Sequence, residues 1–271
     1  MAPDRPCALV TGATAGIGAA FARRLAADSH DLVLVARDAA RLHKQAVALT
    51  EAYGVAVEVL VADLHTDDGM AAVQRRLADP AAPVDLLVNN AGMSLNRSFL
   101  RSTVSAEEQL LSLNVRAVMR LTHAALPGMV ERGRGAVINV SSTAGFGSVM
   151  PGSTYPATKA WVNNFTESVA HAVRPFGVRM LALCPGYVRT EFHQRAGIDT
   201  SRTPGWLWLD ADRVVADALR SLARGRVVRV VDWRYRLIVR AMRLAPRGLV
   251  QAVSRDVRGR IRPDRAADDG G

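Results

Sequence analysis

The sequence is poor in cysteine and aromatic residues and has no long apolar run. Cys7 and Cys184 are the two cysteines among 271 residues, which excludes a disulfide scaffold and a cysteine-based zinc cluster, so we expect no metal. The longest uncharged stretch, residues 135–158, is rich in Gly, Ser, Thr and Pro and does not suit a membrane span. No apolar run precedes Cys7, so we expect no signal peptide and a cytoplasmic protein.

Lysine is also scarce, although the formal net charge is +10. Lys44 and Lys159 are the two lysines, and arginine carries nearly all of the positive charge. Such a charge suits a nucleic acid, an anionic membrane face or an acidic cofactor. Aromatic residues make up 5% and are not interleaved with the basic ones, so we expect no nucleic-acid partner.

Apolar runs of strand length alternate with longer amphipathic stretches along the chain. Continuous Val/Leu runs suggest strands buried on both faces, as in a parallel sheet flanked by helices. We therefore predict an α/β protein with one doubly wound parallel sheet of about seven strands and helices on both faces. The expected strands are Cys7–Thr11, Asp31–Ala36, Ala56–Ala62, Val84–Asn89, Ala136–Ser141, Val178–Cys184 and Val227–Val231. The expected helices are Ile17–Asp28, Ala39–Tyr53, Asp67–Ala78, Ala106–Arg132, Tyr155–Arg174 and Asp210–Arg224.

A glycine-rich turn follows the first expected strand and opens a helix. Its glycines, Gly12, Gly16 and Gly18, let the backbone turn tightly and approach a diphosphate, which the helix N-terminus then binds. The alternative is a purely structural turn. The position between a strand and a helix favours a dinucleotide site.

The end of the second expected strand carries Arg37, where an acidic side chain would bind a ribose 2′-hydroxyl. An arginine there can instead clamp a 2′-phosphate, so we predict NADP(H) rather than NAD(H). The adjacent carboxylate of Asp38 weakens the positive potential at Arg37, and Arg41, a helical turn further on, compensates for this. The alternative is that Arg37 is a solvated arginine without a ligand.

Polar residues also end the third and fourth expected strands. Asp63 can accept from the adenine amino group, and Asn89-Asn90-Ala91-Gly92 allows close approach of a ligand. Each can otherwise cap the next helix.

Tyr155 and Lys159 are four residues apart and share a helix face. The lysine ammonium is expected to lower the phenol pKa, so that the pair exchanges a proton with a carbonyl or alcohol oxygen. Ser142 ends an apolar strand and can hydrogen-bond the same oxygen. Asn114 can hold a water that links Lys159 to solvent, or it is a surface residue.

These motifs together resemble the short-chain dehydrogenase/reductase family over about residues 6–190. The resemblance rests on Thr11-Gly12-xxx-Gly16-Ile17-Gly18, Asp63, Asn89-Asn90-Ala91-Gly92, Asn114, Ser142, Tyr155-xxx-Lys159 and Pro185-Gly186-xxx-Thr190. It implies a Rossmann-like domain and a catalytic set of Asn114, Ser142, Tyr155 and Lys159. It also implies a coenzyme site made of Gly12, Thr14, Gly16, Ile17, Gly18, Arg37, Asp63, Asn90, Ala91, Gly92, Tyr155, Lys159, Pro185, Gly186, Val188 and Thr190. Ala15 stands where many NADP-preferring members carry a basic residue.

The segment 190–209 interrupts the strand–helix rhythm and is expected to cover the substrate. It contains Phe192, His193, Trp206, Leu207 and Trp208, which favour an apolar lid and a hydrophobic substrate. Alternatively, the tryptophans only hold the loop to the core. Met93, Ser94, Gly145 and Phe146 are candidates for the other walls.

The C-terminal region is basic and amphipathic. Trp233–Leu244 carries Arg236, Arg240 and Arg243 on one face, with Leu237, Ile238, Ala241 and Met242 across from them. Such a helix can lie on an anionic bilayer, although covering the sheet edge, packing in a dimer and closing the substrate pocket are together favoured. We divide the chain into a coenzyme-binding domain, 1–232, and a basic extension, 233–271, with a frayed end.

The expected function is NADP(H)-dependent interconversion of a ketone or aldehyde and an alcohol, with Tyr155 as the general acid/base. Two alternatives remain open at this point: a nucleotide-binding regulatory protein without turnover, and a basic membrane or nucleic-acid adaptor. The resemblance implies a homodimer or homotetramer formed through the helices Ala106–Arg132 and Tyr155–Arg174.

Overall fold

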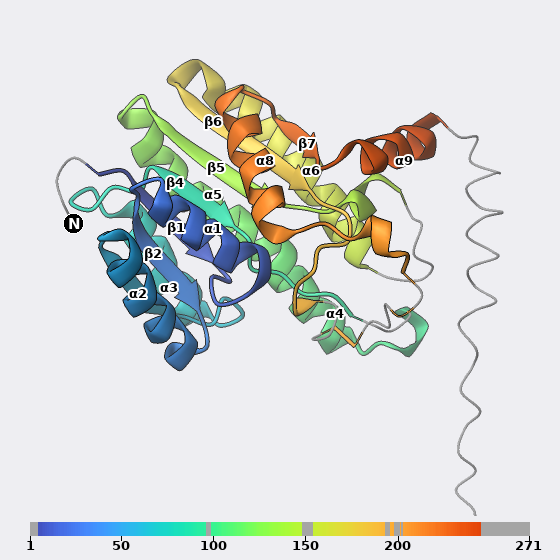
Figure 1. Ribbon diagram of the computed structural model, residues 1–271, viewed down its shortest axis with the longest axis horizontal. Coiled ribbons are helices and arrows are strands. Elements are labelled where there is room, and N and C mark those ends of the chain that lie inside the picture. The colour runs from blue at the N-terminus through green and yellow to red at the C-terminus, as the bar shows by residue number, and fades with distance from the viewer. Residues whose placement is uncertain are drawn as a thin grey trace, which may run out of the picture.

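The fold is described from a computed structural model, which describes residues 5–95, 99–147, 154–192, 196–197, 201 and 203–244. The strands are β1 (Cys7–Thr11), β2 (Asp31–Ala36), β3 (Val57–Val61), β4 (Leu86–Asn89), β5 (Gly135–Val140), β6 (Val178–Cys184) and β7 (Val228–Val230). They form one sheet in the order β3-β2-β1-β4-β5-β6-β7, in which every pairing is parallel (Figure 1). The predicted doubly wound sheet is confirmed, and the strand order reverses between β1 and β4.

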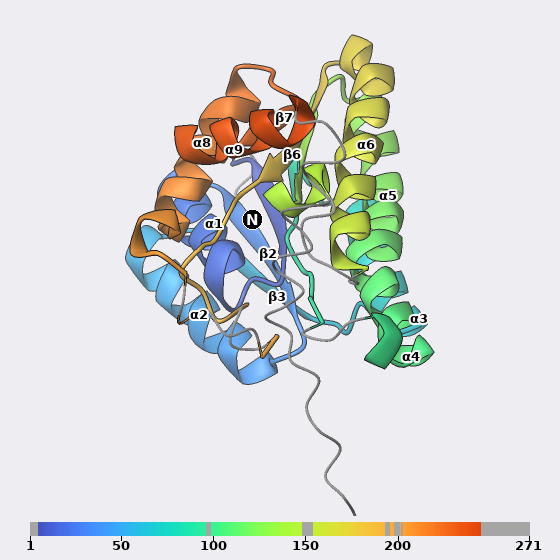
Figure 2. The same cartoon turned by 90° about the vertical axis from the view of Figure 1, so that its right-hand side faces the viewer.

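Helices cover both faces of the sheet (Figure 2). One face packs on α1 (Gly16–Ala27), α2 (Ala39–Tyr53) and α8 (Ala211–Ala223), and the other on α3 (Asp67–Ala78), α5 (Ala117–Glu131) and α6 (Tyr155–Val173). Each layer has its own apolar core, and Phe21 and Met129 are fully buried examples from the two cores. Full burial of a side chain such as Phe21 stabilises the fold by about 2–3 kcal/mol.

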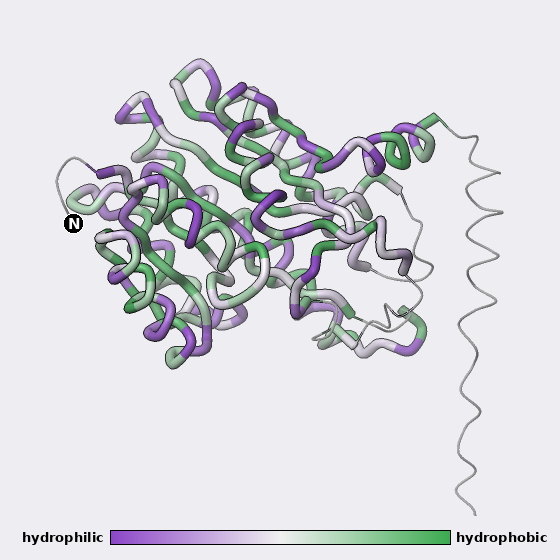
Figure 3. The backbone as a smooth tube through the Cα atoms, viewed as in Figure 1, coloured by the Kyte–Doolittle hydropathy of each residue, from purple (hydrophilic) through white to green (hydrophobic). Residues whose placement is uncertain are grey.

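The expectation that all strands are buried on both faces is wrong for the edges of the sheet. In β3, Glu58 and Val61 are exposed, because β2 is its one partner strand. The central strands β1 and β4 are buried throughout. The hydropathy of the chain follows this pattern, with apolar strands at the centre and mixed helices outside (Figure 3).

The long helix expected over Ala106–Arg132 is interrupted. It consists of α4 (Val104–Leu111), a π-helical turn (Ser112–Arg116) and α5. A π-helical turn accommodates one extra residue, and such turns are frequent at functional sites. The sequence pattern does not reveal the interruption, because apolar residues continue through it.

Helix α9 (Trp233–Leu244) lies beside β7 at the C-terminal end of the described chain (Figures 1 and 2). It buries Tyr235 and Val239, while Leu237 and Ile238 are exposed, so its packed face differs from the expected apolar one. It contacts β7 and the short 3-10 helix η3 (Thr143–Phe146), which follows β5, so it packs at the carboxyl ends of the strands. The division at residue 232 stays a prediction, and the expected frayed end lies outside the described residues.

A search of the described residues for a helix long and apolar enough to span a bilayer finds none.

Candidate active site

The glycine turn lies at the carboxyl ends of β1 and β4, where the strand order reverses. Thr11 Oγ1 accepts hydrogen bonds from the backbone N–H groups of Asn90 and Ala91, each at 3.0 Å. Asn90 Nδ2 donates to the carbonyl oxygens of Thr11 at 2.9 Å and Gly12 at 3.2 Å. Asn90 therefore holds the glycine turn in place, and its neighbour Gly92 lies close to Lys159.

Two glycines of the turn are required by their backbone conformation. Gly12 and Gly16 have φ values of 64° and 55°, which side-chain-bearing residues rarely adopt. A Cβ on Gly16 would lie 2.9 Å from Thr190, so this turn is in close contact with the loop after β6. Helix α1 begins here with no side-chain cap from Ala15 and no acidic residue in its first turn. Its N-terminal N–H groups and positive dipole thus face the turn that Thr14, Ile17 and Gly18 complete.

The second and third strand ends bring Arg37 and Asp63 together. Arg37 is 70% exposed, and its Nη1 lies 3.9 Å from Asp63 Oδ2. Asp63 Oδ1 accepts from the backbone of His65 at 3.0 Å, whereas Thr66 caps α3, so Asp63 is not the helix cap. Arg41 forms ion pairs with Asp38 and with Glu191, at 3.4 and 3.2 Å, and so bridges α2 and the loop after β6.

Asn114 lies in the π-helical turn and is 1% exposed, which rules out a surface residue. Its Oδ1 accepts from the backbone N–H of Met93, and its Nδ2 donates to the Met93 carbonyl oxygen, both at 2.9 Å. Nδ2 also contacts Thr158 Oγ1 at 3.2 Å. Asn114 therefore ties the loop after β4 to α6.

Ser142 follows β5, and Tyr155 begins α6. Pro156 is at the second position of this helix, where its missing N–H costs no helical hydrogen bond. The Ser142 side chain hydrogen-bonds the Tyr155 side chain. Ser142 Oγ also accepts from the backbone of Ala144 at 3.1 Å, which fixes its orientation at the start of η3.

Lys159 is buried next to this pair. Its Nζ lies 5.7 Å from the centroid of the Tyr155 ring and donates to the Val140 carbonyl oxygen at 2.9 Å. Its own carbonyl oxygen accepts from Ser141 Oγ at 3.0 Å. Burial lowers the pKa of Lys159 to about 8, because the charged amine has lost most of its water.

The predicted lowering of the Tyr155 pKa is wrong for the free protein. Burial raises the pKa of Tyr155 to about 12, and the hydrogen bond with Ser142 opposes this only in part. Loss of solvent around the phenolate is thus the dominant effect on this side chain. The tyrosine is consequently a neutral phenol at physiological pH.

The loop 185–190 closes the site on the β6 side. It contains Pro185, Gly186, Val188 and Thr190, and Val188 forms a parallel bridge with Leu209. Phe192 is one of the residues expected to cover the substrate. Its ring centroid lies 6.2 Å from that of Tyr155.

The tryptophans of segment 190–209 differ in their surroundings. The ring centroid of Trp208 lies 5.6 Å from that of Tyr187, so Trp208 packs against the loop 185–190. Trp206, in contrast, is 56% exposed. His193 lies outside the described residues. Among the candidate wall residues, Met93 binds Asn114, Ser94 is buried and Gly145 packs on α6. Phe146 lies under the guanidinium of Arg243, which is 4.8 Å from its ring centroid.

Several residues of the site were not predicted from the sequence. Ser141 binds the carbonyl oxygen of Lys159, Thr158 binds Asn114, and Tyr235 binds the backbone of the loop 185–190. Thr11 belongs to the glycine motif, but its hydrogen bonds to the backbone of Asn90 and Ala91 were not predicted. Thr158 stands between Tyr155 and Lys159 and Ser141 directly precedes Ser142, which is the one signal that the sequence offers for them. Tyr235 is 48 residues from its partner Tyr187, and no local pattern marks it.

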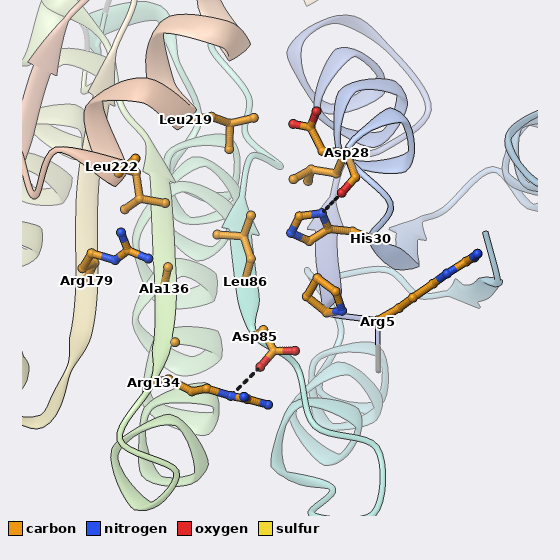
Figure 4. Close-up of a pocket in the computed structure, with 14 residues that line it drawn as sticks. Arg5, Asp28, His30, Asp85, Leu86, Arg134, Ala136, Arg179, Leu219 and Leu222 are labelled. Carbon is orange, nitrogen blue, oxygen red and sulfur yellow. Dashed lines mark hydrogen bonds and ion pairs between the residues drawn. The ribbon is translucent and has the colours of Figure 1, made fainter. Parts of the chain in front are cut away.

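A hollow of about 580 Å³ lies at the opposite, amino ends of the strands (Figure 4). Leu86, Ala136 and Arg179 line it near the beginnings of β4, β5 and β6, together with Asp85 and Arg134. Asp85 and Arg134 form an ion pair at 3.6 Å. The hollow contains none of the predicted site residues, so we place the functional site at the carboxyl ends.

The fold and the site define an α/β oxidoreductase of the dinucleotide-binding type. The family model described as short chain dehydrogenase matches residues 6–200. The chain belongs to the short-chain dehydrogenase/reductase family.

Individual relatives agree with this assignment. The NADP-dependent 3-hydroxy acid dehydrogenase YdfG of Salmonella typhi is 37% identical over 68% of this chain and 73% of its own. A short-chain dehydrogenase from Sphingobium yanoikuyae, solved in complex with NADPH, is 36% identical with a TM-score of 0.79 over 97% of this chain and 99% of its own. The bulky-bulky ketone specific alcohol dehydrogenase from Comamonas testosteroni is 29% identical, with a TM-score of 0.75 over 98% and 97% of the two chains.

Proposed function

We propose that this protein reduces a hydrophobic ketone or aldehyde with NADPH and oxidises the matching alcohol with NADP⁺. The observation that carries the proposal is the cluster of Ser142, Tyr155 and Lys159 beside the glycine turn, at the carboxyl ends of the strands. A phenol, a hydroxyl and an ammonium at one point are the groups that protonation of a carbonyl oxygen needs.

The residues around the glycine turn fit an NADP(H) molecule. The uncapped N-terminus of α1 offers N–H groups to the diphosphate, and Gly12 and Gly16 keep the approach free of side chains. Arg37 is exposed at the end of β2, where it can pair with the 2′-phosphate. The NADPH complex of the Sphingobium neighbour and the NADP dependence of the Salmonella relative support this choice. When bound, the coenzyme supplies the hydride.

The chain itself handles the proton. Tyr155 donates its phenolic proton to the carbonyl oxygen, and Ser142 hydrogen-bonds the same oxygen and orients it. The Lys159 ammonium stabilises the phenolate that remains on Tyr155. Asn114 acts through Met93 and Thr158 by holding the two elements that carry the site. In the reverse direction, Tyr155 accepts the proton of the alcohol.

The walls favour a hydrophobic substrate. Phe192 faces Tyr155, and Phe146 follows Ser142 in η3. An apolar wall beside a few polar groups is typical of small-molecule sites. The ketone specificity named for the Comamonas neighbour is in line with this substrate class.

An assay of NADPH absorbance over a panel of ketones and aldehydes tests the proposal. We expect turnover by the native chain, and a loss of several orders of magnitude in Tyr155→Phe with NADPH binding retained. NADPH binding without turnover on any substrate would favour the regulatory alternative. Near-normal turnover by Tyr155→Phe would refute the role of Tyr155 as proton donor.

We also propose a cytoplasmic homodimer or homotetramer formed through α5 and α6. Met119 on α5 is 44% exposed and offers apolar surface for such an interface. Sedimentation velocity measures the subunit number directly, and a monomer at all concentrations would contradict the proposal.

A further inference from the structure

One phenol oxygen outside the catalytic cluster joins the two segments that border the site. Tyr235 Oη accepts a hydrogen bond from the backbone N–H of Tyr187 at 2.9 Å. The same oxygen donates to the carbonyl oxygen of Leu207 at 2.7 Å. Tyr187 belongs to the loop 185–190, and Leu207 belongs to the segment that precedes α8. Because Tyr235 comes from α9, the C-terminal helix determines how these two segments lie relative to each other.

The ring of Tyr235 packs directly on the loop 185–190. A Cβ built on Gly186 would lie 1.9 Å from Cζ of Tyr235, so the ring lies flat against backbone that bears no side chain. Tyr235 is 4% exposed and belongs to the core between the sheet and α8. The phenol therefore has no room to rotate away without moving Gly186.

The first turn of α9 is itself held firmly. Arg234 donates twice to the buried carboxylate of Asp232, at 2.9 Å, and also to the carbonyl oxygen of Trp206. The guanidinium of Arg234 lowers the pKa of Asp232 to about 2, so the pair stays charged. Consecutive side chains of α9 thus bind the consecutive carbonyl oxygens of Trp206 and Leu207.

The two segments also bind each other beside this contact. The N–H of Leu209 donates to the Tyr187 carbonyl oxygen at 2.8 Å, and the N–H of Arg189 donates to the Leu209 carbonyl oxygen at 3.0 Å. These bonds continue from Tyr187 toward Thr190, which contacts the glycine turn through Gly16. A displacement at Tyr187 would therefore move the loop 185–190 and the segment expected to cover the substrate, while Thr11 and Asn90 hold the glycine turn separately.

We propose that Tyr235 is a positioning residue. It sets the spacing between the loop 185–190 and the segment 206–209, so that a nicotinamide and a carbonyl carbon meet at the distance needed for hydride transfer. This inference rests on the proposed function, because it places the nicotinamide at the loop 185–190. Tyr235 acts through backbone groups. Burial raises the pKa of its phenol, which keeps the proton that the bond to Leu207 requires.

The variant Tyr235→Phe removes the oxygen and keeps the ring. The matched control is Tyr53→Phe, the same change on a tyrosine that is 42% exposed at the end of α2. Two probes separate the halves of the coenzyme: NADPH contains the nicotinamide, and 2′,5′-ADP contains only the adenosine half. We measure the dissociation constants of both, together with KM, kcat and the isotope effect with 4-deuterated NADPH.

We expect the affinity of Tyr235→Phe for NADPH to fall by up to about 5- to 30-fold, the limit reached if NADPH binding must restore all of the order lost with one or two hydrogen bonds, with the affinity for 2′,5′-ADP unchanged. The isotope effect should rise because hydride transfer becomes slower relative to product release, and KM for the carbonyl substrate should rise because the displaced segment 206–209 binds the substrate less well. p-Aminophenylalanine at position 235 should restore most of the NADPH affinity. Equal losses for NADPH and 2′,5′-ADP, or no loss for either, would overturn the proposal.

Hydrogen exchange of the peptide that contains Tyr187 gives a readout that does not depend on catalysis. The backbone N–H of Tyr187 should exchange faster in Tyr235→Phe than in Tyr53→Phe, and unchanged exchange would refute the structural premise. If the exchange rises while neither protein oxidises NADPH, the proposed activity has failed and the contact has not. If Tyr235→Phe does not fold, Arg234→Gln loosens the same turn from the surface. It should raise KM without changing the affinity for 2′,5′-ADP, and an unchanged KM would count against the proposal.

Discussion

Replacement of Lys159 by methionine should make the protein more stable while abolishing its activity. Lys159 is 6% exposed, and burial moves the pKa of its amine from 10.5 to about 8. Each pKa unit corresponds to 1.36 kcal/mol, so at pH 7 the charged amine destabilises the folded state by about 3 kcal/mol. Methionine has a similar length and no charge. It forfeits the hydrogen bond to the Val140 carbonyl oxygen, a loss of about 1 kcal/mol.

The net expectation for Lys159→Met is a gain of about 2 kcal/mol in the free energy of unfolding at pH 7. The pH dependence provides the sharper test. Between pH 8 and pH 10.5 the unfolded chain binds a proton at Lys159 that the folded chain has released, so the stability of the native protein rises with pH in this window. The advantage of the variant should be constant below pH 8 and should fade by pH 10.5.

Urea unfolding from pH 6 to pH 10 measures this difference, and the chain provides its own control. Lys44 is the other lysine, lies exposed on α2, and should show no such effect when replaced by methionine. A Lys159→Met variant less stable than the native chain at pH 7 would refute the argument that desolvation dominates at this amine. A stability difference that does not change with pH would refute the assigned pKa.

Three further results follow from the charges around the site. Arg37→Asp should weaken NADPH binding about 10- to 100-fold, as expected for the loss of a charged hydrogen bond, and invert the coenzyme preference; unchanged kinetics with both coenzymes would remove the assignment. Glu191→Gln should release Arg41 from its ion pair and tighten NADPH binding up to about fivefold, with NADH binding unaffected. Weaker NADPH binding would show instead that this ion pair maintains the shape of the site. The rate of carbonyl reduction should fall above about pH 8 as Lys159 loses its proton, while Tyr155, with its pKa near 12, does not titrate; a rate that is constant to pH 10 would contradict this.

The sequence was sufficient for the sheet and for most of the site. β1, β2, β6, α2 and α3 begin and end at the predicted residues, because buried Val/Leu runs and capped amphipathic helices are local signals. The position of the site follows from one topological rule: the carboxyl ends of parallel strands meet where the strand order reverses. Gly12, Asn90 and Tyr155 could therefore be assigned to one region without knowledge of any distance.

Features that depend on packing could not be predicted. At the π-helical turn, the Asn114 side chain binds both backbone groups of Met93, across 21 residues of chain. The direction of the Tyr155 pKa depends on how much water its ring loses, which the spacing to Lys159 does not reveal. Likewise, the packed face of α9 includes Tyr235, whose ring lies against Gly186, a contact across 49 residues that no local pattern reveals.

Energetically unfavourable features lie at the carboxyl ends of the strands as well as at the amino ends, where Asp31 Oδ2 and Arg132 Nε are buried without a hydrogen-bond partner among the described residues. At the carboxyl ends, Lys159 is a buried cation, and Asn89 Oδ1 and Asn163 Nδ2 are buried without a hydrogen-bond partner among the described residues. Each of these costs free energy that an apolar residue would not, and the apolar cores on the two faces of the sheet offset that cost. At Lys159 such a cost is expected if selection maintains the charge for proton transfer, since stability and activity then make opposite demands on one side chain. Substitution of Lys159 by an uncharged residue of similar size should therefore stabilise the fold and remove activity together, whereas changes around the hollow at the amino ends should not affect activity.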